Sequence, residues 1–163
     1  MKFYLKTKNN GFSLVEVLVA CSIITLTSLS LMSATTKGIE LSNRALRQVE
    51  ATQLMEEGVE AVKTIRDSDW NVISNLNLDT NYYLSFNTST NTWSLISTPV
   101  APIDNIFTRI IVLSGVNRDS NDSISSSGTL DTGSKKVNIS VSWLVSNGTN
   151  SKNITFYLTN IFN

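Results

Sequence analysis

A run of 20 residues without a charged side chain, from Val17 to Thr36, constrains this chain more than any other feature. As an α-helix the run would be about 30 Å long, at roughly 1.5 Å per residue. That length matches the hydrocarbon core of a bilayer, which is about 30 Å thick. Lys2, Lys6 and Lys8 precede the run, with no acidic residue among the first ten positions. Because positive residues stay on the cytoplasmic side, we expect a single membrane span with the C-terminus outside.

A cleavable signal peptide is the alternative interpretation of this segment. Such a peptide needs a short apolar core followed by a cleavage site of small residues. Residues 28–34 include small side chains, but the apolar run is long for that role and begins next to Glu16. A carboxylate in hydrocarbon costs roughly 3 kcal/mol or more. We therefore expect Glu16 to have a function and a partner.

The helical pattern continues beyond the apolar run, without a proline, to about residue 68. In residues 37–68 the apolar and charged side chains fall on different faces at spacings of three and four, so this half needs a surface to cover it. We predict one helix over about 12–68, with residues 12–36 as its transmembrane half and 37–68 as its amphipathic half. Thr35, Thr36 and Gly38 have low helix propensity, so this is the weakest point of the predicted helix and the place most prone to bend or fray.

After Trp70 the pattern changes to the alternation that is typical of strands. We predict an antiparallel sheet of four to five strands in residues 69–163, with its apolar face covering the amphipathic half of the helix. The chain is therefore expected to be an α+β protein. The predicted strands cover residues 82–86, 92–97, 106–113, 135–145 and 153–160.

Residues 115–134 are rich in Ser, Gly, Asp and Asn, and we predict a loop of about 20 residues, long enough to be functional or mobile. Asp119, Asn121 and Asp122 are similar to the start of a calcium-binding loop. An EF-hand loop needs a glycine at its sixth position and an acidic residue at its twelfth, where this chain has Ile124 and Leu130. We therefore interpret the segment as a solvated turn and assign no metal site.

Composition narrows the functional classes. The chain has 163 residues, enough for one domain and an appended segment, with 13 basic and 13 acidic side chains. It has no histidine, which removes the commonest general base and metal ligand, so we predict no enzyme activity and no cofactor. The single cysteine, Cys21, cannot form an internal disulfide. Lys135 and Lys136 are too small a basic cluster to indicate nucleic-acid binding.

The segment over residues 6–36 closely resembles the N-terminal signature of type IV pilins and type II secretion pseudopilins. The resemblance rests on a basic leader that ends in Gly11 and on the sequence FSLVEVLVA at positions 12–20. It implies a pilin-like fold and a cytoplasmic leader, residues 1–11, that a prepilin peptidase removes after Gly11. Phe12 would then become the N-terminus and be N-methylated.

The resemblance also assigns Glu16 to subunit assembly. Cleavage would create a cationic amine at Phe12, one helical turn before Glu16, and in the family this glutamate is thought to meet the terminal amine of a neighbouring subunit. Two buried charges cost much less when they are paired, so only a correctly staggered subunit would neutralise both. On spacing alone two other roles remain open: Glu16 reaches the membrane interface, or it pairs with the amine of its own subunit.

The implied function is that of a structural subunit of a type IV pilus or related filament. The length and the absence of a C-terminal cysteine pair favour a minor subunit. A type II secretion or competence pseudopilin is one alternative, and a membrane-anchored extracytoplasmic binding module is another. Many type IV pilins have a proline within the apolar segment, and this chain has none between Phe12 and Lys37.

The resemblance also implies partners and a location. The expected partners are the prepilin peptidase/methyltransferase, other pilin subunits, the inner-membrane assembly platform and, before assembly, membrane lipid. Nucleic acid is not indicated. We expect a single-pass inner-membrane protein that later becomes part of an extracellular filament or a pseudopilus.

Overall fold

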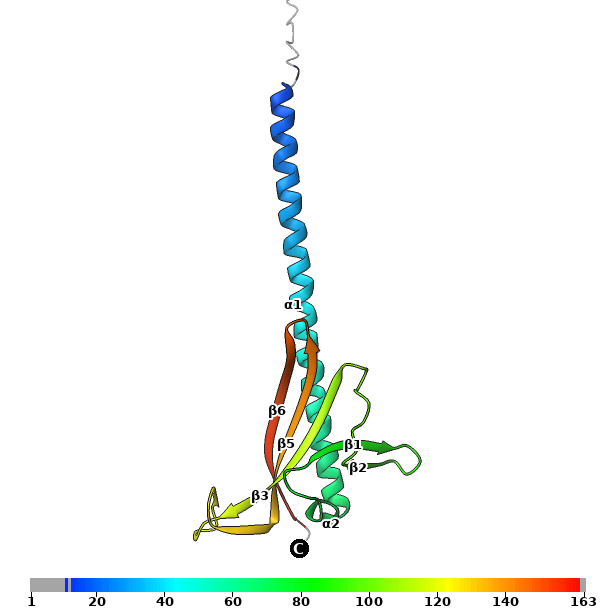
Figure 1. Cartoon of the computed structure of the whole chain (residues 1–163), viewed down its shortest axis with the longest axis vertical. Helices are drawn as coiled ribbons and strands as arrows, with labels where there is room; N and C mark the ends of the chain where they lie inside the picture. The colour runs from blue at the N-terminus through cyan, green and yellow to red at the C-terminus, as the bar shows by residue number, and fades with distance from the viewer. Residues whose placement is uncertain (1–10, 12, 162–163) are drawn as a thin grey trace, which may run out of the picture. The chain divides into compact units, whose positions relative to one another are not determined.

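The computed structural model describes residue 11 and residues 13–161, which form a long helix, a short helix and six strands. Helix α1 runs from Leu14 to Ser68 (Figure 1). The chain divides into two compact units, the first ending at Ala45 and the second beginning at Leu46. The predicted α+β fold, with one long N-terminal helix followed by an antiparallel sheet, is confirmed.

The described part of the first unit is almost entirely helical, and its side chains are exposed except for the half-buried Glu40. Six Ser and Thr hydroxyls in this part donate hydrogen bonds to helix carbonyl oxygens three or four residues earlier. Because these bonds satisfy the hydroxyls locally, the six residues need no partner in an apolar environment. The donors are Ser22, Thr25, Thr27, Ser30, Thr35 and Thr36, with bond lengths of 2.7–3.0 Å.

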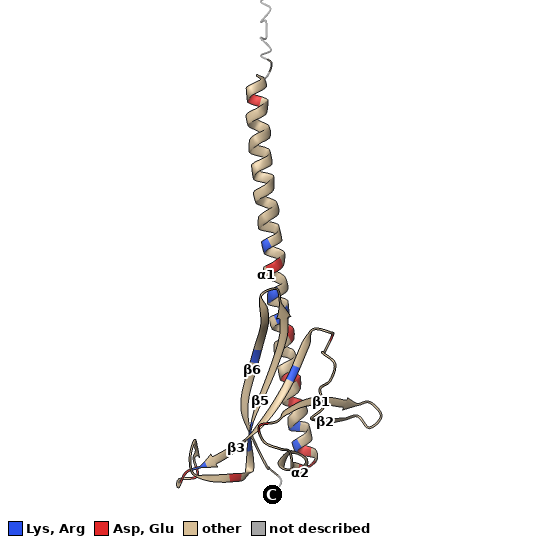
Figure 2. Cartoon of the chain, viewed as in Figure 1, with Lys and Arg blue, Asp and Glu red and all other residues tan. Residues whose placement is uncertain are grey.

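The helix is continuous through Gly38, where sequence propensity predicted its weakest point. Charged side chains stabilise this part of the helix along its surface. Glu40 forms ion pairs with Lys37, at 3.0 Å, and with Arg44. The hydrogen bond from Lys37, together with the positive charges of Arg44 and Lys37, lowers the pKa of the Glu40 carboxyl. Figure 2 shows that these charges follow the long uncharged interval of α1.

In the second unit, α1 buries a single stripe of small and apolar side chains. Their spacing of three and four residues places them on one face of the helix, as the amphipathic pattern predicted. The buried residues are Ala51, Met55, Gly58, Ala61, Val62 and Ile65.

A second helix, α2, spans Trp70–Ser74 and was not predicted. The chain leaves α1 at Asp69, whose backbone is extended (φ −164°, ψ 114°). The carboxylate of Asp69 then accepts a hydrogen bond of 2.9 Å from the backbone N–H of Asn71. Asp69 is therefore the N-cap of α2, a position where aspartate satisfies an otherwise unpaired helix N–H.

Six antiparallel strands form one sheet in the order β2-β1-β3-β5-β6, and β4 pairs with β3. Five of them correspond to the predicted strands. The sixth, β4, has only two residues, too few to leave an alternating pattern in the sequence. The bounds are β1 Asn81–Asn87, β2 Thr92–Ile96, β3 Phe107–Arg118, β4 Ile124–Ser125, β5 Thr129–Val145 and β6 Gly148–Thr159.

The prediction of a loop over residues 115–134 is wrong. Strand β3 continues to Arg118, and β5 already begins at Thr129. The two strands stay paired to the end, with Val116 opposite Asp131 and Arg118 opposite Thr129. Polar composition indicated a loop, but backbone pairing between neighbouring strands stabilises this segment without an apolar face.

The helix stripe and one face of the sheet form two adjoining core clusters. The larger cluster contains Val62 and Ile65 from α1 and Ile111, Val137 and Ile139 from the sheet. The smaller one joins helix and sheet residues around a pair of aromatic rings, Phe107 and Trp143, whose centroids lie 5.8 Å apart in an edge-to-face arrangement. Trp70 and Trp93 pack against the larger cluster. All three tryptophans thus contribute to packing.

Candidate functional site

The predicted processing and assembly residues lie where α1 begins. The helix starts at Leu14, and the N–H of Val17 donates a 3.2 Å hydrogen bond to the carbonyl oxygen of Ser13. Glu16 lies in the first turn and is exposed. Gly11 precedes the helix and is also exposed. Phe12 and leader residues 1–10 lie outside the described residues, so the expected N-methylation site cannot be placed beside Glu16.

Gly11 has no steric reason, within the described residues, to be a glycine. A Cβ atom built on it would have no described atom within 4 Å. Gly58, in contrast, would bring a Cβ to 3.3 Å from side-chain atoms of Arg109 and Ile139. The packing of the described chain therefore favours a glycine at position 58 and makes no such demand at position 11.

Glu16 is the only charged side chain between Gly11 and Lys37. Among the described residues, its carboxylate has no hydrogen-bond or ion-pair partner, whereas six nearby hydroxyls bond to helix carbonyl oxygens. Within the described chain, Glu16 is stabilised by its place in the first turn of α1, where the partial positive charge of the helix N-terminus favours an acidic side chain.

Ser13 and Glu16 also match a capping-box pattern, Ser-x-x-Glu, that the sequence analysis did not consider. In a complete box each side chain bonds to the backbone N–H of the other residue. Between these two described residues neither side-chain bond is formed, so the Glu16 carboxylate is not engaged in local capping. The pattern alone would assign Glu16 to capping, so a capping role is the local alternative to a role in assembly.

The apolar part of α1 meets the requirements of a membrane span. By length and composition it is long and apolar enough to cross a bilayer, and it lies near the N-terminus. Such a helix is compatible with a membrane anchor, and the same test is passed by signal sequences. The sequence motif at the start of the helix is therefore what distinguishes a membrane anchor from a signal sequence.

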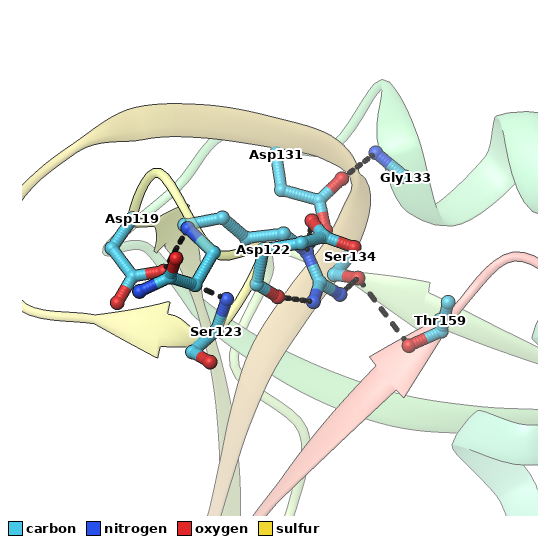
Figure 3. A network of polar contacts seen from close by, with 9 residues as sticks. Asp119, Asp122, Ser123, Asp131, Gly133, Ser134 and Thr159 are labelled. Carbon is cyan, nitrogen blue, oxygen red and sulfur yellow. Dashed lines mark hydrogen bonds and ion pairs between the residues drawn. The ribbon is translucent and has the colours of Figure 1, made fainter.

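In the acidic turn that is similar to the start of a calcium-binding loop, the Asp119 carboxylate is already hydrogen-bonded within the turn. One oxygen of Asp119 accepts hydrogen bonds from the backbone N–H groups of Asn121 and Ser123, both at 2.9 Å (Figure 3). Asp122 takes a left-handed backbone conformation, with φ 61°. Within residues 11 and 13–161 no group of three or more His, Cys, Asp or Glu side chains could hold a metal ion.

The lysine pair at positions 135 and 136 is divided between the two faces of β5. Lys135 is buried, and Lys136 is exposed. Adjacent strand residues point to opposite faces, so the pair does not make a joint basic patch.

The comparisons with known proteins agree with the motif at the start of the helix. A family model described as the prokaryotic N-terminal methylation motif matches residues 6–32. Neither the curated proteins nor the solved structures gave a match. The matched segment contains Lys6 and Lys8 before Gly11, the glycine itself, Glu16 and most of the apolar run. The resemblance to the pilins is thus confirmed: the chain carries the N-terminal signature of type IV pilins and pseudopilins, joined to an α+β fold of pilin-like arrangement.

Proposed function

We propose that this protein is a structural subunit, and a minor one, of a type IV pilus or a related filament. The observation that carries the proposal is the methylation motif at residues 6–32, which is placed directly at the start of a helix apolar enough to span a membrane. That helix continues into a folded sheet domain. A pilin signature indicates a structural role rather than catalysis, and it implies processing by a prepilin peptidase and assembly with other pilins.

The first step of the proposal is cleavage after Gly11. The absence of any packing demand at Gly11 supports it, because a glycine that the fold does not need is available for an external requirement such as a peptidase site. The positive leader would hold the N-terminus on the cytoplasmic side, where the enzyme acts, and the sheet domain would lie outside. The new N-terminus, Phe12, would then be methylated.

The second step is pairing of Glu16 with the amine released at Phe12 of a neighbouring subunit. A carboxylate without a partner is expensive in an apolar environment, and the same holds for the amine. Since Glu16 is the only charged side chain between Gly11 and Lys37, it is the side chain in this region for which an unpaired state costs most. Joining the two charges would lower the cost of both and select the correct stagger between subunits.

Mass spectrometry of the protein from its native host tests the first step. We expect a mature chain that begins at Phe12 and carries one methyl group on its amine. The same measurement on a Gly11→Val variant should return the intact leader. A native chain that begins at Met1, or that is cut beyond residue 20, would refute the proposed processing.

Substitutions at Glu16 and Ser13 distinguish a role of Glu16 in subunit assembly from a role in helix capping. Glu16→Gln keeps the length and hydrogen-bonding capacity of the side chain but removes its charge, so a capping role would tolerate it. We expect Glu16→Gln to be cleaved and membrane-inserted normally and to be lost from sheared filaments. Ser13→Ala, which removes the capping hydroxyl and leaves the charge, serves as the matched control and should still assemble. Normal incorporation of Glu16→Gln would remove the proposed charge pair.

A pseudopilin of a secretion or competence system is the alternative within the same structural class. The two proposals differ in abundance and location, which a quantitative proteomic count of purified filaments would measure. A minor pilus subunit should be found at low copy number in extracellular filaments. A pseudopilin should stay with the cell envelope. A membrane-anchored binding module, the remaining alternative, would keep its leader, stay in the cell envelope and show no association with filaments on fractionation.

A further inference from the structure

The far end of the β3–β5 hairpin forms a small substructure of its own. We call it the arm: residues 116–131, comprising the last residues of β3, the two-residue strand β4 and the start of β5. Strand β4 pairs with the end of β3, so the arm contains three short paired segments. Figure 1 shows it, in yellow, turning away from the other strands of the sheet.

An irregularity in the sheet separates the arm from the rest of the hairpin. Gly115 of β3 pairs with Lys135, but the next residue, Val116, pairs with Asp131. Three residues of β5, 132–134, are therefore left without a partner on β3. They are held by β6 instead: Ser134 pairs with Thr159, and the carbonyl oxygen of Gly133 accepts a 2.9 Å bond from Asn160. Such a bulge interrupts the ladder on both strands at one point, which is the geometry of a hinge.

The carboxylate of Asp131 connects the arm to the bulge. One oxygen of Asp131 accepts a 2.8 Å hydrogen bond from the backbone N–H of Gly133, inside the bulge. Its other oxygen forms a 2.7 Å ion pair with Nε of Arg118, inside the arm. Figure 3 shows this network around Asp131 and Ser134. Asp131 thus connects Arg118 of the arm to Gly133 of the bulge.

The guanidinium of Arg118 also bonds to one residue within the arm and to one residue in the bulge. Its Nη1 donates to the carbonyl oxygen of Asp122 at 2.8 Å, within the arm, and its Nη2 donates to the hydroxyl of Ser134 at 3.4 Å. Ser134 is fully buried and shares a 3.3 Å hydrogen bond with the hydroxyl of Thr159. The side chains of Arg118 and Asp131 are 28% and 19% exposed, so water screens the pair only in part.

Apolar packing gives the arm less support than it gives the body of the sheet. Val116 is buried next to the bulge, but the two larger apolar side chains of the arm, Ile124 and Leu130, are exposed. Since little apolar area is removed from water, polar contacts carry a larger share of the stability here. The arm also forms one wall of a groove of about 370 Å³, whose other wall includes Lys136 and Tyr157 of the sheet.

We propose that the arm is a hinged element, with the bulge as its hinge and, as its lock, the bonds by which the Asp131–Arg118 pair holds Gly133 and Ser134 of the bulge. While the pair is closed, the arm keeps the orientation seen here and the groove keeps its width. When the pair opens, the arm turns as a unit about residues 132–134, and the strands outside the arm stay folded. This proposal does not depend on the function proposed above.

Double electron–electron resonance on the full chain in detergent tests the lock. In a Cys21→Ser background, spin labels at Ser120→Cys in the arm and Asn153→Cys on β6 would report the arm's orientation. We expect one narrow distance distribution with Asp131 intact and a broadened one in Asp131→Asn. In the same variant, amide hydrogen exchange in residues 116–131 should accelerate at least about tenfold, with residues 137–141 unchanged.

Two further variants make the test specific. Asp104→Asn changes an exposed aspartate that, among the described residues, has no ion pair, and should behave as wild type. Arg118→Gln should loosen the arm as Asp131→Asn does, and the double variant should be no looser than either single one, because both remove the same interaction. An unchanged distance distribution in Asp131→Asn overturns the proposal. Acceleration that extends equally to residues 137–141 also overturns it, because it indicates general unfolding.

Discussion

Two carboxylates of this chain, Asp131 and Glu16, illustrate opposite uses of the same chemical group. Both oxygens of Asp131 are occupied, by Gly133 and Arg118, so its role is internal to the fold. Among the described residues Glu16 has no partner, so a role for its charge must come from outside this chain or from the residues before the helix. The contrast explains why the sequence motif around Glu16 predicted function and the sequence around Asp131 predicted only a polar loop.

Asp131 should make stability depend on pH in the acidic range. Its hydrogen bond with Arg118 is the largest cause that lowers the pKa of the Asp131 carboxyl in the folded state. A lowered folded pKa stabilises the protein above the unfolded pKa, near 4, and this contribution is lost as pH falls through the folded pKa. We expect wild type to unfold at higher urea than Asp131→Asn at pH 7, with the difference shrinking below about pH 4. A difference that stays constant down to pH 2.5 would contradict this linkage.

Gly58 is the glycine at which α1 packs closely against the sheet, so its replacement should disturb the core. A Cβ at this position would lie 3.3 Å from Cδ of Arg109 and from two side-chain carbons of Ile139. Gly58→Val should therefore destabilise the second unit by about 1–3 kcal/mol, as overpacking does in other cores. Thermal unfolding followed by near-UV circular dichroism measures this loss. Gly38→Val is the matched control: it introduces the same side chain where no described atom lies within 4 Å, and it should leave the transition unchanged.

At the scale of elements, the sheet is attached to α1 by polar contacts as well as by the apolar stripe. Arg109 of β3 is buried, and its Nη1 donates a 2.8 Å hydrogen bond to the carbonyl oxygen of Leu54. Lys152 of β6 reaches the same helix, with Nζ 2.9 Å from the hydroxyl of Thr52. These contacts specify the position of the helix along the strands, which apolar contacts alone determine less sharply because they are non-directional.

The ion pair between Arg109 and Glu57 offers a clean test of this attachment. Nη2 of Arg109 lies 3.2 Å from Oε1 of Glu57, and the two side chains are 6% and 46% exposed. Glu57→Gln would leave a buried cation without its counter-charge, and we expect a loss of about 1 kcal/mol in urea unfolding, moderated by the exposure of the glutamate. Glu56→Gln removes the same charge from the adjacent residue, which has no ion pair among the described residues, and should cost little. Equal effects of the two variants would show that the pair does not matter.

At the scale of the whole molecule, the buried core belongs to the second unit alone. Both core clusters are built from residues between Ala51 and Leu158, and the first unit contributes none of their members. A compact unit with its own core can fold independently. The division matches the proposed function, in which one part of the chain is used in the membrane and in contacts with other subunits and the other is exposed outside the cell.

We therefore expect a fragment of residues 46–163 to fold without the first unit. Its loss of the apolar helix should make it soluble without detergent, with a melting temperature within about 5 °C of the second unit in the full chain, equivalent to roughly 1 kcal/mol. Circular dichroism and calorimetry on both proteins make the comparison. A fragment that shows no cooperative transition would mean that the second unit depends on the first.

Most of the fold could be predicted from the sequence because its elements have long periodic patterns. Helix α1 has 55 residues, and the strand pattern of residues 135–145 lies within the 17 residues of β5. The errors concern short or polar elements. Helix α2 has five residues and β4 two, so neither gives a measurable period. The arm was missed because its strands are stabilised by pairing and by Asp131, neither of which leaves an apolar signature.

The sequence by itself determined the apolar run long enough to span a membrane, the methylation motif with Gly11 and Glu16, and the α+β order, because these depend on neighbouring residues and on local periodicity. Only the tertiary structure decided that Gly58 lies in a close contact between helix and sheet, that Arg109 is buried against the helix, and that Asp131 joins Gly133 to Arg118 beside a bulge. These interactions depend on strand register and on the approach of helix to sheet. Register follows from pairing between distant segments, and no local pattern of residues specifies it.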